Sequence, residues 1–371
     1  MQLLSKNLVL IHSNYHPDNH GGIEYVVKML LEIVVENSID TLCFFGGTLN
    51  TQECFYKPRI AIVGRRVVAK IAGVSFLSFG NLRFLYACLK SRVVIFQEPY
   101  PTLWPAMFVI RYLLRTPTIL LVHANPVAST PVMKAYSFFR GVIFRGAVCV
   151  ATSPNLLSQV RSKNYIANQV IPLCLSDRSF SYSNSLNLPE RYVLYIGRLA
   201  RYKGLEYLVE AATMQPGINF VIAGNGPLSY SIANAIDAKA LKNIIFFNRF
   251  ISEPEKNELI ERSEFVVFPS TSANEAFGLV QLEAMRAGKA LINTWIDTGV
   301  NYVAPNGVCA ITVEKCNSIA LSKAIEYLWN DIELMAKLGS SGLARYEDLF
   351  THTQFLDAWT MLVKSMIKKV R

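Results

Sequence analysis

The chain has 371 residues, of which 51% are hydrophobic and 17% charged, and its formal net charge at pH 7 is +10. This composition excludes a disordered chain and a single small domain, and it suits two globular domains of somewhat under about 200 residues each. Residues 1–180 hold 18 Lys and Arg against 8 Asp and Glu, whereas residues 181–371 hold 19 of each, so the excess belongs to the first half. We expect that half to have an anionic partner.

The sequence shows no signal for export, membrane insertion or a zinc site. Its seven cysteines have no CxxC spacing, which is typical of reduced thiols in a cytosolic protein. The short apolar stretch near the N-terminus predicts a first buried strand rather than a signal peptide. The longest apolar segment, Leu103–Val122, contains Arg111, Arg115 and two prolines, and a membrane-spanning helix needs about 18 uninterrupted apolar residues. We therefore predict a cytoplasmic protein.

Short apolar runs alternate with amphipathic helical stretches along the whole chain. This alternation predicts an α/β protein with parallel sheets and right-handed crossovers. Among the expected helices are Leu205–Thr213 and Glu253–Glu261. The expected strands are Leu8–His12, Thr41–Phe45, Val93–Phe96, Thr118–His123, Val148–Ala151, Gln169–Ile171, Tyr192–Ile196, Phe220–Ala223, Ile244–Phe247, Phe265–Phe268 and Ala290–Asn293.

A segment without periodicity divides the chain into two domains. Ser176–Leu188 is rich in Ser and Asn, which predicts an interdomain linker. We expect an N-terminal Rossmann-like domain over residues 1–178 and a second one over residues 189–352. Residues 353–371 form an amphipathic helix that we expect to pack back toward the N-terminal domain.

A glycine pair follows the first expected strand. The backbone N–H groups of Gly21 and Gly22, at the start of a helix, could meet a phosphate, although a plain glycine-rich connection is the alternative. Pro17 and the glycines interrupt any helix upstream, so a metal site formed by a helical stripe of histidines is not expected. These histidines are His12, His16 and His20.

His123 ends one of the expected strands. The carboxyl edge of a parallel sheet is where ligands of open α/β folds collect, which favours a functional histidine. Strand-terminal histidines are also common as structural residues. Both interpretations stay open on the residues alone.

Two segments of the first half, Gly64–Arg92 and Pro131–Arg145, interleave basic residues with Phe, Leu and Val. This mixture is typical of a surface that lies on anionic lipid. Nucleic-acid binding is the competing use of basic charge, and a buried helix with a solvated rim is a third interpretation. The basic residues are Arg65, Arg66, Lys70, Arg83, Lys90, Arg92, Lys134, Arg140 and Arg145.

In the second half, a pair of cations follows the strand that ends at Ile196. Gly197 permits a tight turn, and Arg198 and Lys203 precede a helix that opens near Gly204. Two cations between a strand end and a helix N-terminus predict a clamp for phosphate charge, whereas two solvated basic residues are the alternative.

The glycines of the next strand end do not form a dinucleotide fingerprint. Gly224 and Gly226 flank Asn225, but Ser229 occupies the position of a third glycine, and this unit is not the first of the chain. We expect a tight turn near the nucleotide rather than NAD binding.

Two glutamates flank the start of another helix. Glu275 lies in the loop before a helix that begins near Gly278, and Glu283 lies about two turns along it. A helix N-terminus suits a diphosphate, and carboxylates beside it can accept hydrogen bonds from sugar or ribose hydroxyls. The alternative is that both glutamates are solvated on the surface. The surrounding FPS, EAFG and LEAM sequences disfavour this alternative.

On these motifs the sequence resembles glycosyltransferase family four, retaining enzymes of the GT-B fold, and among them bacterial O-antigen and surface-polysaccharide transferases. The resemblance runs over nearly the whole chain. It is most specific from Tyr192 to Thr294, where an E-x7-E motif and a GR…KG element occur. The family's fold has two Rossmann-like domains whose parallel sheets face each other across a cleft.

The resemblance implies a role for each motif residue. Arg198 and Lys203 hold the donor diphosphate, Glu275 with the backbone of Ala276–Gly278 holds the donor sugar, and Glu283 holds the ribose. The catalytic set is then His123, Glu275, Arg198 and Lys203. The donor-binding set is Gly21, Gly22, Gly197, Gly224, Asn225, Phe250, Ala276, Phe277, Gly278, Leu279 and Glu283.

The chain departs from the family pattern at two places. Ile171–Ser176 reads IPLCLS where IPxGxD is usual, and Asn248-Arg249-Phe250 replaces a common glycine before the nucleotide-facing loop. The second departure leaves the donor base open.

The resemblance implies transfer of a hexose from a nucleoside diphosphate sugar to a lipid-linked saccharide acceptor, as in lipopolysaccharide O-antigen biosynthesis. GDP-mannose is the first donor we expect and a UDP-hexose the second. No metal or other cofactor is expected, because cations and backbone N–H groups replace it, and no nucleic acid. The enzyme is expected to associate peripherally with the inner face of the membrane through its N-terminal domain. Alternatives are another GT-B enzyme, such as a sugar-nucleotide epimerase or a phosphorylase, and a non-catalytic membrane-associated subunit.

Overall fold

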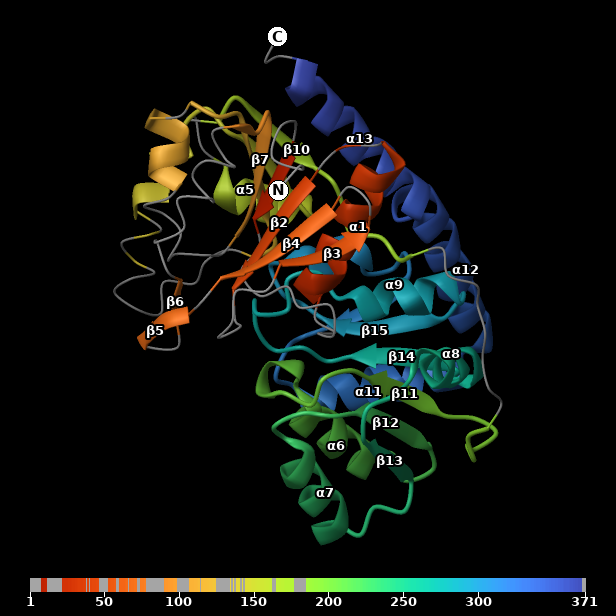
Figure 1. Cartoon of the computed structure of the whole chain (residues 1–371). Helices are drawn as coiled ribbons and strands as arrows, with labels where there is room; N and C mark the ends of the chain where they lie inside the picture. Colours follow the sequence, from red (N-terminus) through yellow and green to blue (C-terminus); the bar gives the residue numbers. More distant parts are fainter. Residues whose placement is uncertain are drawn as a thin grey trace. The chain divides into compact units, whose positions relative to one another are not determined.

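The computed structural model describes most of the chain and separates it into two compact units (Figure 1). The first comprises Met1–Pro172 and Thr353–Arg371, and the second Leu173–His352. The first unit thus ends ahead of the predicted linker. The described residues are 8–11, 22–37, 39, 41–46, 53–57, 60–65, 67–71, 74–77, 90–98, 107–113, 115–124, 134, 136, 138–140, 142, 144–161, 165–176 and 185–368.

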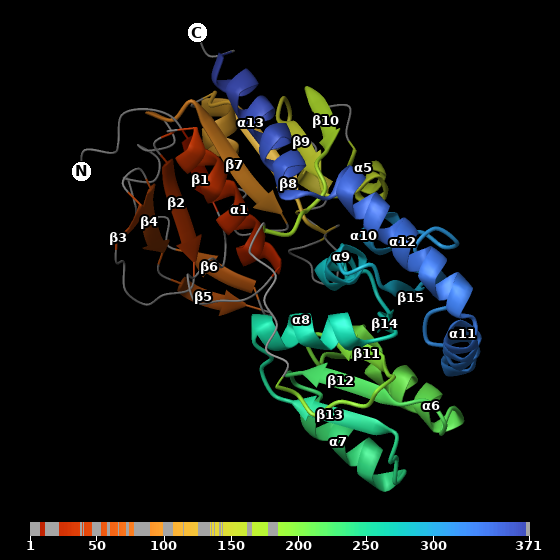
Figure 2. The same cartoon turned by 90° about the vertical axis from the view of Figure 1, so that its right-hand side faces the viewer.

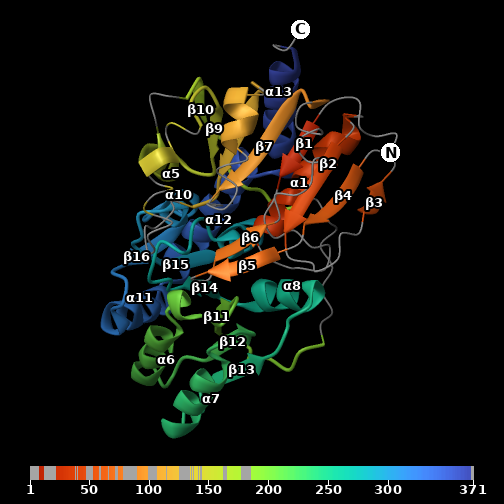
Figure 3. The same cartoon turned by 60° about the vertical axis from the view of Figure 1, so that its left-hand side comes forward.

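The first unit contains an eight-stranded sheet of order β10-β9-β8-β7-β1-β2-β4-β3 (Figure 3). Every neighbouring pair is parallel except β3 with β4, and β5 and β6 form a separate antiparallel hairpin. The strands are β1 Leu8–Ile11, β2 Thr41–Gly46, β3 Glu53–Lys57, β4 Ile60–Arg65, β5 Val67–Ile71, β6 Val74–Leu77, β7 Val93–Glu98, β8 Thr118–Val122, β9 Val148–Ala151 and β10 Ala167–Val170. The central strands β7, β8 and β9 are buried along their whole length, as continuous apolar runs of parallel sheets are.

The C-terminal helix belongs to the first unit. Helix α13 (His352–Lys368) lies beside α1 (Gly22–Glu36), as Figure 2 shows. The side-chain amide of Asn37, just after α1, donates to Thr360 Oγ1 at 3.1 Å. Leu30 of α1 and Val363 of α13 also line one small apolar cavity. The remaining helical segments of this unit include Val109–Leu113 and α5 (Pro154–Val160).

The second unit contains a six-stranded, fully parallel sheet of order β13-β12-β11-β14-β15-β16. The strands are β11 Val193–Ile196, β12 Phe220–Gly224, β13 Ile244–Asn248, β14 Phe265–Phe268, β15 Ala290–Thr294 and β16 Ala310–Val313. The chain runs from β11 outward to β13 and then returns to β14, so the strand order reverses between the neighbours β11 and β14.

Helices cover both faces of this sheet. Helices α6, α7 and α11 share one apolar core with it, and Figure 2 shows α8 and α9 on the other face. The helices are α6 Leu205–Met214, α7 Ser229–Ala238, α8 Glu253–Arg262, α9 Leu279–Arg286, α10 Gly299–Val303, α11 Ser318–Asn330 and α12 Ile332–Leu349, and a one-turn 3₁₀ helix spans Arg201–Lys203. A capping box of Ser252 and Glu255 starts α8.

Each strand expected from the sequence is present within two residues at either end, and the α/β class is confirmed. Strands β3 to β6 and β16 were not expected. They are four to six residues long; charged residues break or border all of these runs except β6, so periodicity alone does not reveal them. Segment Gly64–Arg92 contains strands β5 and β6, while its residues 78–89 lie outside the described residues, so the helix interpretation stays a prediction there. Within the described ranges, no helix is both long and apolar enough to cross a membrane.

Candidate functional site

The predicted donor residues of the second unit gather where its strand order reverses. Gly197 and Arg198 follow β11, and Pro269 and Ser270 follow the adjacent β14. In open parallel sheets, ligands bind beyond the carboxyl ends of the strands at such a reversal. The tertiary structure therefore brings two sequence-distant motifs to one edge.

The turns after β11 and β12 pack directly on each other. The amide of Gly197 donates to the carbonyl of Ala223, and that of Leu199 to the carbonyl of Asn225, both at 3.0 Å. Gly224 has φ 148°, and a Cβ atom there would lie 1.9 Å from the carbonyl oxygen of Gly197. Because only glycine allows this approach, Gly224 supports the turn after β11 rather than offering an open surface.

A second close contact fixes Lys203. Gly204 follows it with φ 66°, and a Cβ atom at Gly204 would lie 2.1 Å from the carbonyl oxygen of Pro269. The amide of Thr271 donates to the carbonyl of Tyr202 at 2.8 Å. These contacts hold the loop after β11 against the loop after β14.

Lys203 and Glu275 form a buried ion pair at this junction. Each residue is 8% exposed, and the ammonium of Lys203 contacts the carboxylate of Glu275. Ser270 Oγ donates to Glu275 Oε2 at 3.3 Å, and the Lys203 ammonium lies 4.9 Å from the ring centroid of Phe268. Burial, together with the charge of Glu275, raises the pKa of the Tyr195 hydroxyl. A buried ammonium needs an anionic partner, and Glu275 supplies it.

Side-chain packing and backbone hydrogen bonds hold the loop between Glu275 and α9 in place. The side chain of Phe277 is buried and packs edge-on against Phe350, with ring centroids 6.2 Å apart. The carbonyl of Ala276 accepts from the amide of Gly299 at 2.8 Å. Gly278 is the N-cap residue of α9 and Leu279 its first residue. The ring of Phe277 is thus part of the core and does not face a ligand.

A buried amide network holds this loop from behind, and the sequence did not reveal it. Gln281 and Asn293 are fully buried, and Asn293 Nδ2 donates to Gln281 Oε1 at 3.0 Å. Gln281 Nε2 in turn donates to the carbonyls of Phe277 and Val300 at 3.4 and 3.1 Å. Thr312 Oγ1 donates to Asn293 Oδ1 at 2.7 Å. The only signal in the sequence was the presence of side-chain amides, those of Gln281 and Asn293, within an otherwise apolar helix face and strand.

Glu283 on α9 also has a lysine partner that sequence reasoning missed. Lys256 of α8 lies 2.6 Å from Glu283 Oε1. The two helices are separated by β14 in the chain, so no spacing rule links these residues. Glu283 is half-buried, whereas Leu282 and Met285 on the same helix are fully buried.

Three other predicted residues are exposed at the same edge. Arg198 is exposed and forms no ion pair with another residue in the part of the chain that the structure describes. Asn225 is exposed, and Ser229 Oγ donates to its Oδ1 at 3.5 Å. Phe250, after β13, is 64% exposed. Of the two predicted clamp residues, therefore, Lys203 is already paired and Arg198 faces solvent.

His123 lies in the first unit, directly after β8. It is buried, and its Nε2 lies 2.8 Å from Gln97 Oε1 at the end of β7. Burial lowers the pKa of His123 from the ordinary 6.5 to about 4. The imidazole is therefore neutral at pH 7, and Gln97 orients it.

The first unit also contains a buried charge cluster next to His123. Arg140 Nε donates to Glu98 Oε1 at 2.9 Å, and the Tyr136 hydroxyl donates to the same carboxylate. All three residues are buried. The prediction that Arg140 belongs to a lipid-facing surface is therefore wrong, because its guanidinium neutralises a carboxylate inside the fold.

Several predicted residues lie outside the described residues or at their border. Gly21, His12, His16, His20, Arg66 and Arg83 are not among the described residues, and Gly22 is the first residue of α1.

Comparison with known proteins identifies the chain. Residues 178–345, which contain the whole Lys203–Glu275 site, match the family model described as glycosyl transferases group 1. O-antigen chain mannosyltransferase C of Escherichia coli is 26% identical over 368 residues, which cover 96% of this chain and 98% of that protein. The chain is a glycosyltransferase.

Further relatives support this glycosyltransferase assignment. D-rhamnosyltransferase WbpZ of Pseudomonas aeruginosa is 28% identical over 367 residues, which cover 92% of this chain and 91% of that protein. Among solved structures, sucrose-phosphate synthase of Thermosynechococcus elongatus superposes with a TM-score of 0.78 at 20% identity, over 98% of this chain and 100% of that one. HepE of Anabaena, in complex with UDP and glucose, has a TM-score of 0.74 at 16% identity, over 97% of this chain and 100% of that one. These likenesses show that the glycosyltransferase has the GT-B fold.

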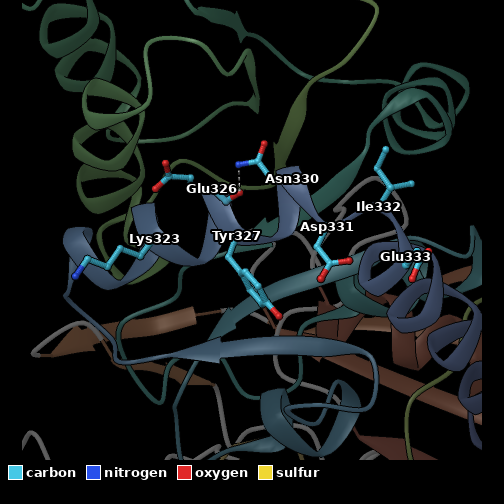
Figure 4. Close-up of a pocket in the computed structure, with 7 residues that line it drawn as sticks. All are labelled: Lys323, Glu326, Tyr327, Asn330, Asp331, Ile332 and Glu333. Atoms are coloured by element: carbon cyan, nitrogen blue, oxygen red, sulfur yellow. Dashed lines mark hydrogen bonds between the residues drawn. The ribbon is translucent and has the colours of Figure 1, made fainter.

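The glycosyltransferase has a hollow of about 700 Å³ at the junction of α11 and α12 (Figure 4). Helix α11 runs back from the carboxyl edge of the sheet, so its end lies at the opposite edge from Lys203 and Glu275. Figure 4 shows Glu326 and Asn330 on one side of α11 and Tyr327 on the other, so these side chains do not converge. The lining residues are Lys323, Glu326, Tyr327, Asn330, Asp331, Ile332 and Glu333, none of which was predicted as a site residue.

Proposed function

We propose that this glycosyltransferase moves a hexose, with retention at the anomeric carbon, from a nucleoside diphosphate sugar to a lipid-linked saccharide in O-antigen or other surface-polysaccharide biosynthesis. The observation that carries the proposal is the junction of Lys203, Glu275 and the N-terminus of α9 at the strand reversal. The cation and the N–H groups at the start of α9 suit the diphosphate of such a donor, and the carboxylates suit the hydroxyls of its sugar and ribose.

Electrostatic stabilisation of the leaving group is the proposed source of catalysis. The diphosphate gains charge as its bond to the anomeric carbon breaks, and Lys203, Arg198 and the N–H groups at α9 stabilise that charge. No metal is needed in this scheme. Glu275 and the backbone of Ala276–Gly278 bind the sugar hydroxyls, and Glu283 binds the ribose.

We also propose a front-side reaction, since the motifs of the sequence offer no nucleophile for double displacement. The acceptor hydroxyl attacks from the side on which the diphosphate leaves, and its proton passes to the leaving phosphate oxygen. His123 is assigned to the reacting face of the sugar. Its neutral imidazole, with a pKa of about 4, can exchange hydrogen bonds with hydroxyls without adding a positive charge.

The donor sugar is proposed from the relatives' names. A mannosyltransferase and a D-rhamnosyltransferase are similar over nearly the whole chain, which supports GDP-mannose as the first donor to test. The UDP and glucose bound to HepE support a UDP-hexose as the second.

A basic and aromatic surface of the first unit supports an anionic membrane as the place of the acceptor. Phe138 is 79% exposed, and Phe108, Phe139 and Val142 are also exposed. Lys134, Arg115 and Arg145 are also exposed, within residues 107–115 and 134–145, which contain these apolar side chains. Between Glu53 and Asp177 the sequence has one acidic residue, Glu98, and the structure buries it against Arg140. Exposed aromatic and basic side chains without acidic neighbours suit anionic lipid.

The test of the function combines binding and transfer. A panel of sugar nucleotides is screened by thermal shift, and the true donor raises the melting temperature. Transfer of radiolabelled sugar to a membrane-lipid extract is then measured for wild type, Glu275→Ala and Glu190→Ala. Glu190 is exposed just before β11, at the opposite edge of the sheet, so its variant keeps the wild-type rate. Wild-type transfer by Glu275→Ala disproves the site, and free isomerised sugar nucleotide without transfer points to an epimerase.

A further inference from the structure

Lys256 of α8 bridges two carboxylates, one on its own helix and one on α9. Its ammonium lies 2.6 Å from Glu283 Oε1 and 2.8 Å from Glu253 Oε1. The side chains of Lys256 and Glu283 are 18% and 14% exposed, whereas that of Glu253 is 70% exposed. Water screens the contact with Glu283 least, so this contact is the stronger of the two.

The contact occupies only one oxygen of Glu283. Lys256 donates to Oε1, while Oε2 accepts no hydrogen bond from any other residue in the described ranges. A carboxylate held at one oxygen presents the lone pairs of the other in a fixed direction. That geometry suits a ligand hydroxyl, which needs an acceptor in a defined place.

Charge balance gives a second reason for this lysine. A carboxylate close to a bound diphosphate repels it unless a cation offsets the charge. Burial lowers the pKa of the Lys256 ammonium, but the charge of Glu283 and hydrogen bonds with Glu253 and Glu283 outweigh burial and raise it overall. Lys256 therefore remains charged at neutral pH beside Glu283.

We propose that Lys256 is a positioning residue of the donor site, which aims Glu283 at the ribose hydroxyls and offsets its repulsion of the diphosphate. The inference rests on the proposed function, since it takes Glu283 as the ribose ligand. Glu275 has the same arrangement, because Lys203 from a neighbouring strand–helix unit contacts its carboxylate. Each acidic residue of the site thus has its own lysine.

Comparing the binding of a nucleotide with that of its dideoxy form separates this role from a purely structural one. Dissociation constants of UDP and GDP and of their 2′,3′-dideoxy forms are measured by calorimetry on the full chain. In wild type the ribose hydroxyls strengthen binding, and Lys256→Met removes about tenfold of that advantage, the worth of one hydrogen bond to a charged group. The dideoxy forms lose only the part of the affinity that comes from the charge offset, so the ratio of the constants of each nucleotide and its dideoxy form isolates the ribose contacts. Lys256→Arg, which keeps the charge, retains most of the ribose preference.

The control variant is Lys239→Met, which removes the exposed Lys239–Glu210 ion pair of the same unit. It should leave the dissociation constants of the nucleotides and of their dideoxy forms unchanged. Should Lys256→Met melt early, Lys256→Gln replaces it. A ribose preference equal to that of wild type in Lys256→Met or Lys256→Gln overturns the role of Lys256 while the donor site stands. A wild-type protein that binds neither nucleotide, nor any nucleoside diphosphate of the panel, overturns the donor site and this role together.

Discussion

The ammonium of Lys203 and the carboxylate of Glu275 lie against each other beyond two neighbouring strands, and each side chain is 11% exposed. Removing one partner leaves the other charge buried and unpaired, which costs about 3 kcal/mol or more. We expect Lys203→Met to lower the free energy of unfolding by that amount and to abolish transfer. The double variant Lys203→Met/Glu275→Gln is expected to lose less than the sum of the single variants, by about 1–3 kcal/mol. Denaturant titration of all four proteins measures this coupling, and additive losses would show that the contact is weak.

Gly224 tests the backbone contact between the turns after β11 and β12. A Cβ atom at this position would lie 1.9 Å from the carbonyl oxygen of Gly197. Gly224→Ala is expected to lower the free energy of unfolding by more than about 2 kcal/mol. Gly217→Ala is the matched control, because a Cβ atom there meets nothing within 4 Å, and its effect should stay within about 0.5 kcal/mol. Similar melting temperatures for both variants would contradict the packing described.

Arg140 tests the buried charge cluster of the first unit. Arg140→Ala leaves the fully buried carboxylate of Glu98 without its cation. We expect a loss of about 3–5 kcal/mol in the free energy of unfolding of this unit. Arg145→Ala removes an exposed arginine a few residues away and should change stability by less than about 0.5 kcal/mol. An Arg140→Ala protein as stable as Arg145→Ala would place the guanidinium on the surface after all.

His123 makes the stability of the first unit depend on pH. Its pKa is lowered to about 4 in the folded state, so between pH 6.5 and 4 the unfolded chain binds a proton that the folded chain does not. The stability associated with the neutral imidazole is therefore complete above pH 6.5 and is lost as the pH falls toward 4, in total about 3 kcal/mol.

Urea titrations of wild type and His123→Gln at a series of pH values measure this effect, because the variant lacks the titrating group. As the pH falls from 7 to 4, wild type should lose about 3 kcal/mol more free energy of unfolding than His123→Gln loses. A histidine that titrates near 6.5 in the folded protein by NMR would contradict its burial.

Phe138 and Phe139 test the membrane surface. Phe138→Ser/Phe139→Ser should weaken binding to vesicles that contain anionic lipid by about tenfold or more, because both residues are exposed and apolar. Tyr230→Ser is the control, since Tyr230 is about as exposed as Phe138 but lies on α7 of the second unit. Vesicle sedimentation at low and high salt provides the measurement, and unchanged binding by the double variant would exclude this surface.

Local sequence patterns were sufficient to predict much of the fold of this glycosyltransferase. Alternating apolar runs predicted its two parallel sheets, because buried parallel strands are apolar along their whole length and need no partner information to be recognised. The motif positions of Lys203, Gly204, Glu275 and Glu283 also follow from the sequence, since strand ends and helix starts have local signals.

Only the tertiary structure decided which charges meet. The pairs Lys256–Glu283 and Arg140–Glu98 and the amide pair Gln281–Asn293 join residues on separate helices and strands. Their geometry depends on strand order and helix packing, which the periodicity of a single segment does not contain. A lysine or arginine in the sequence looks the same whether it faces water or neutralises a buried carboxylate, and its burial separates the two cases.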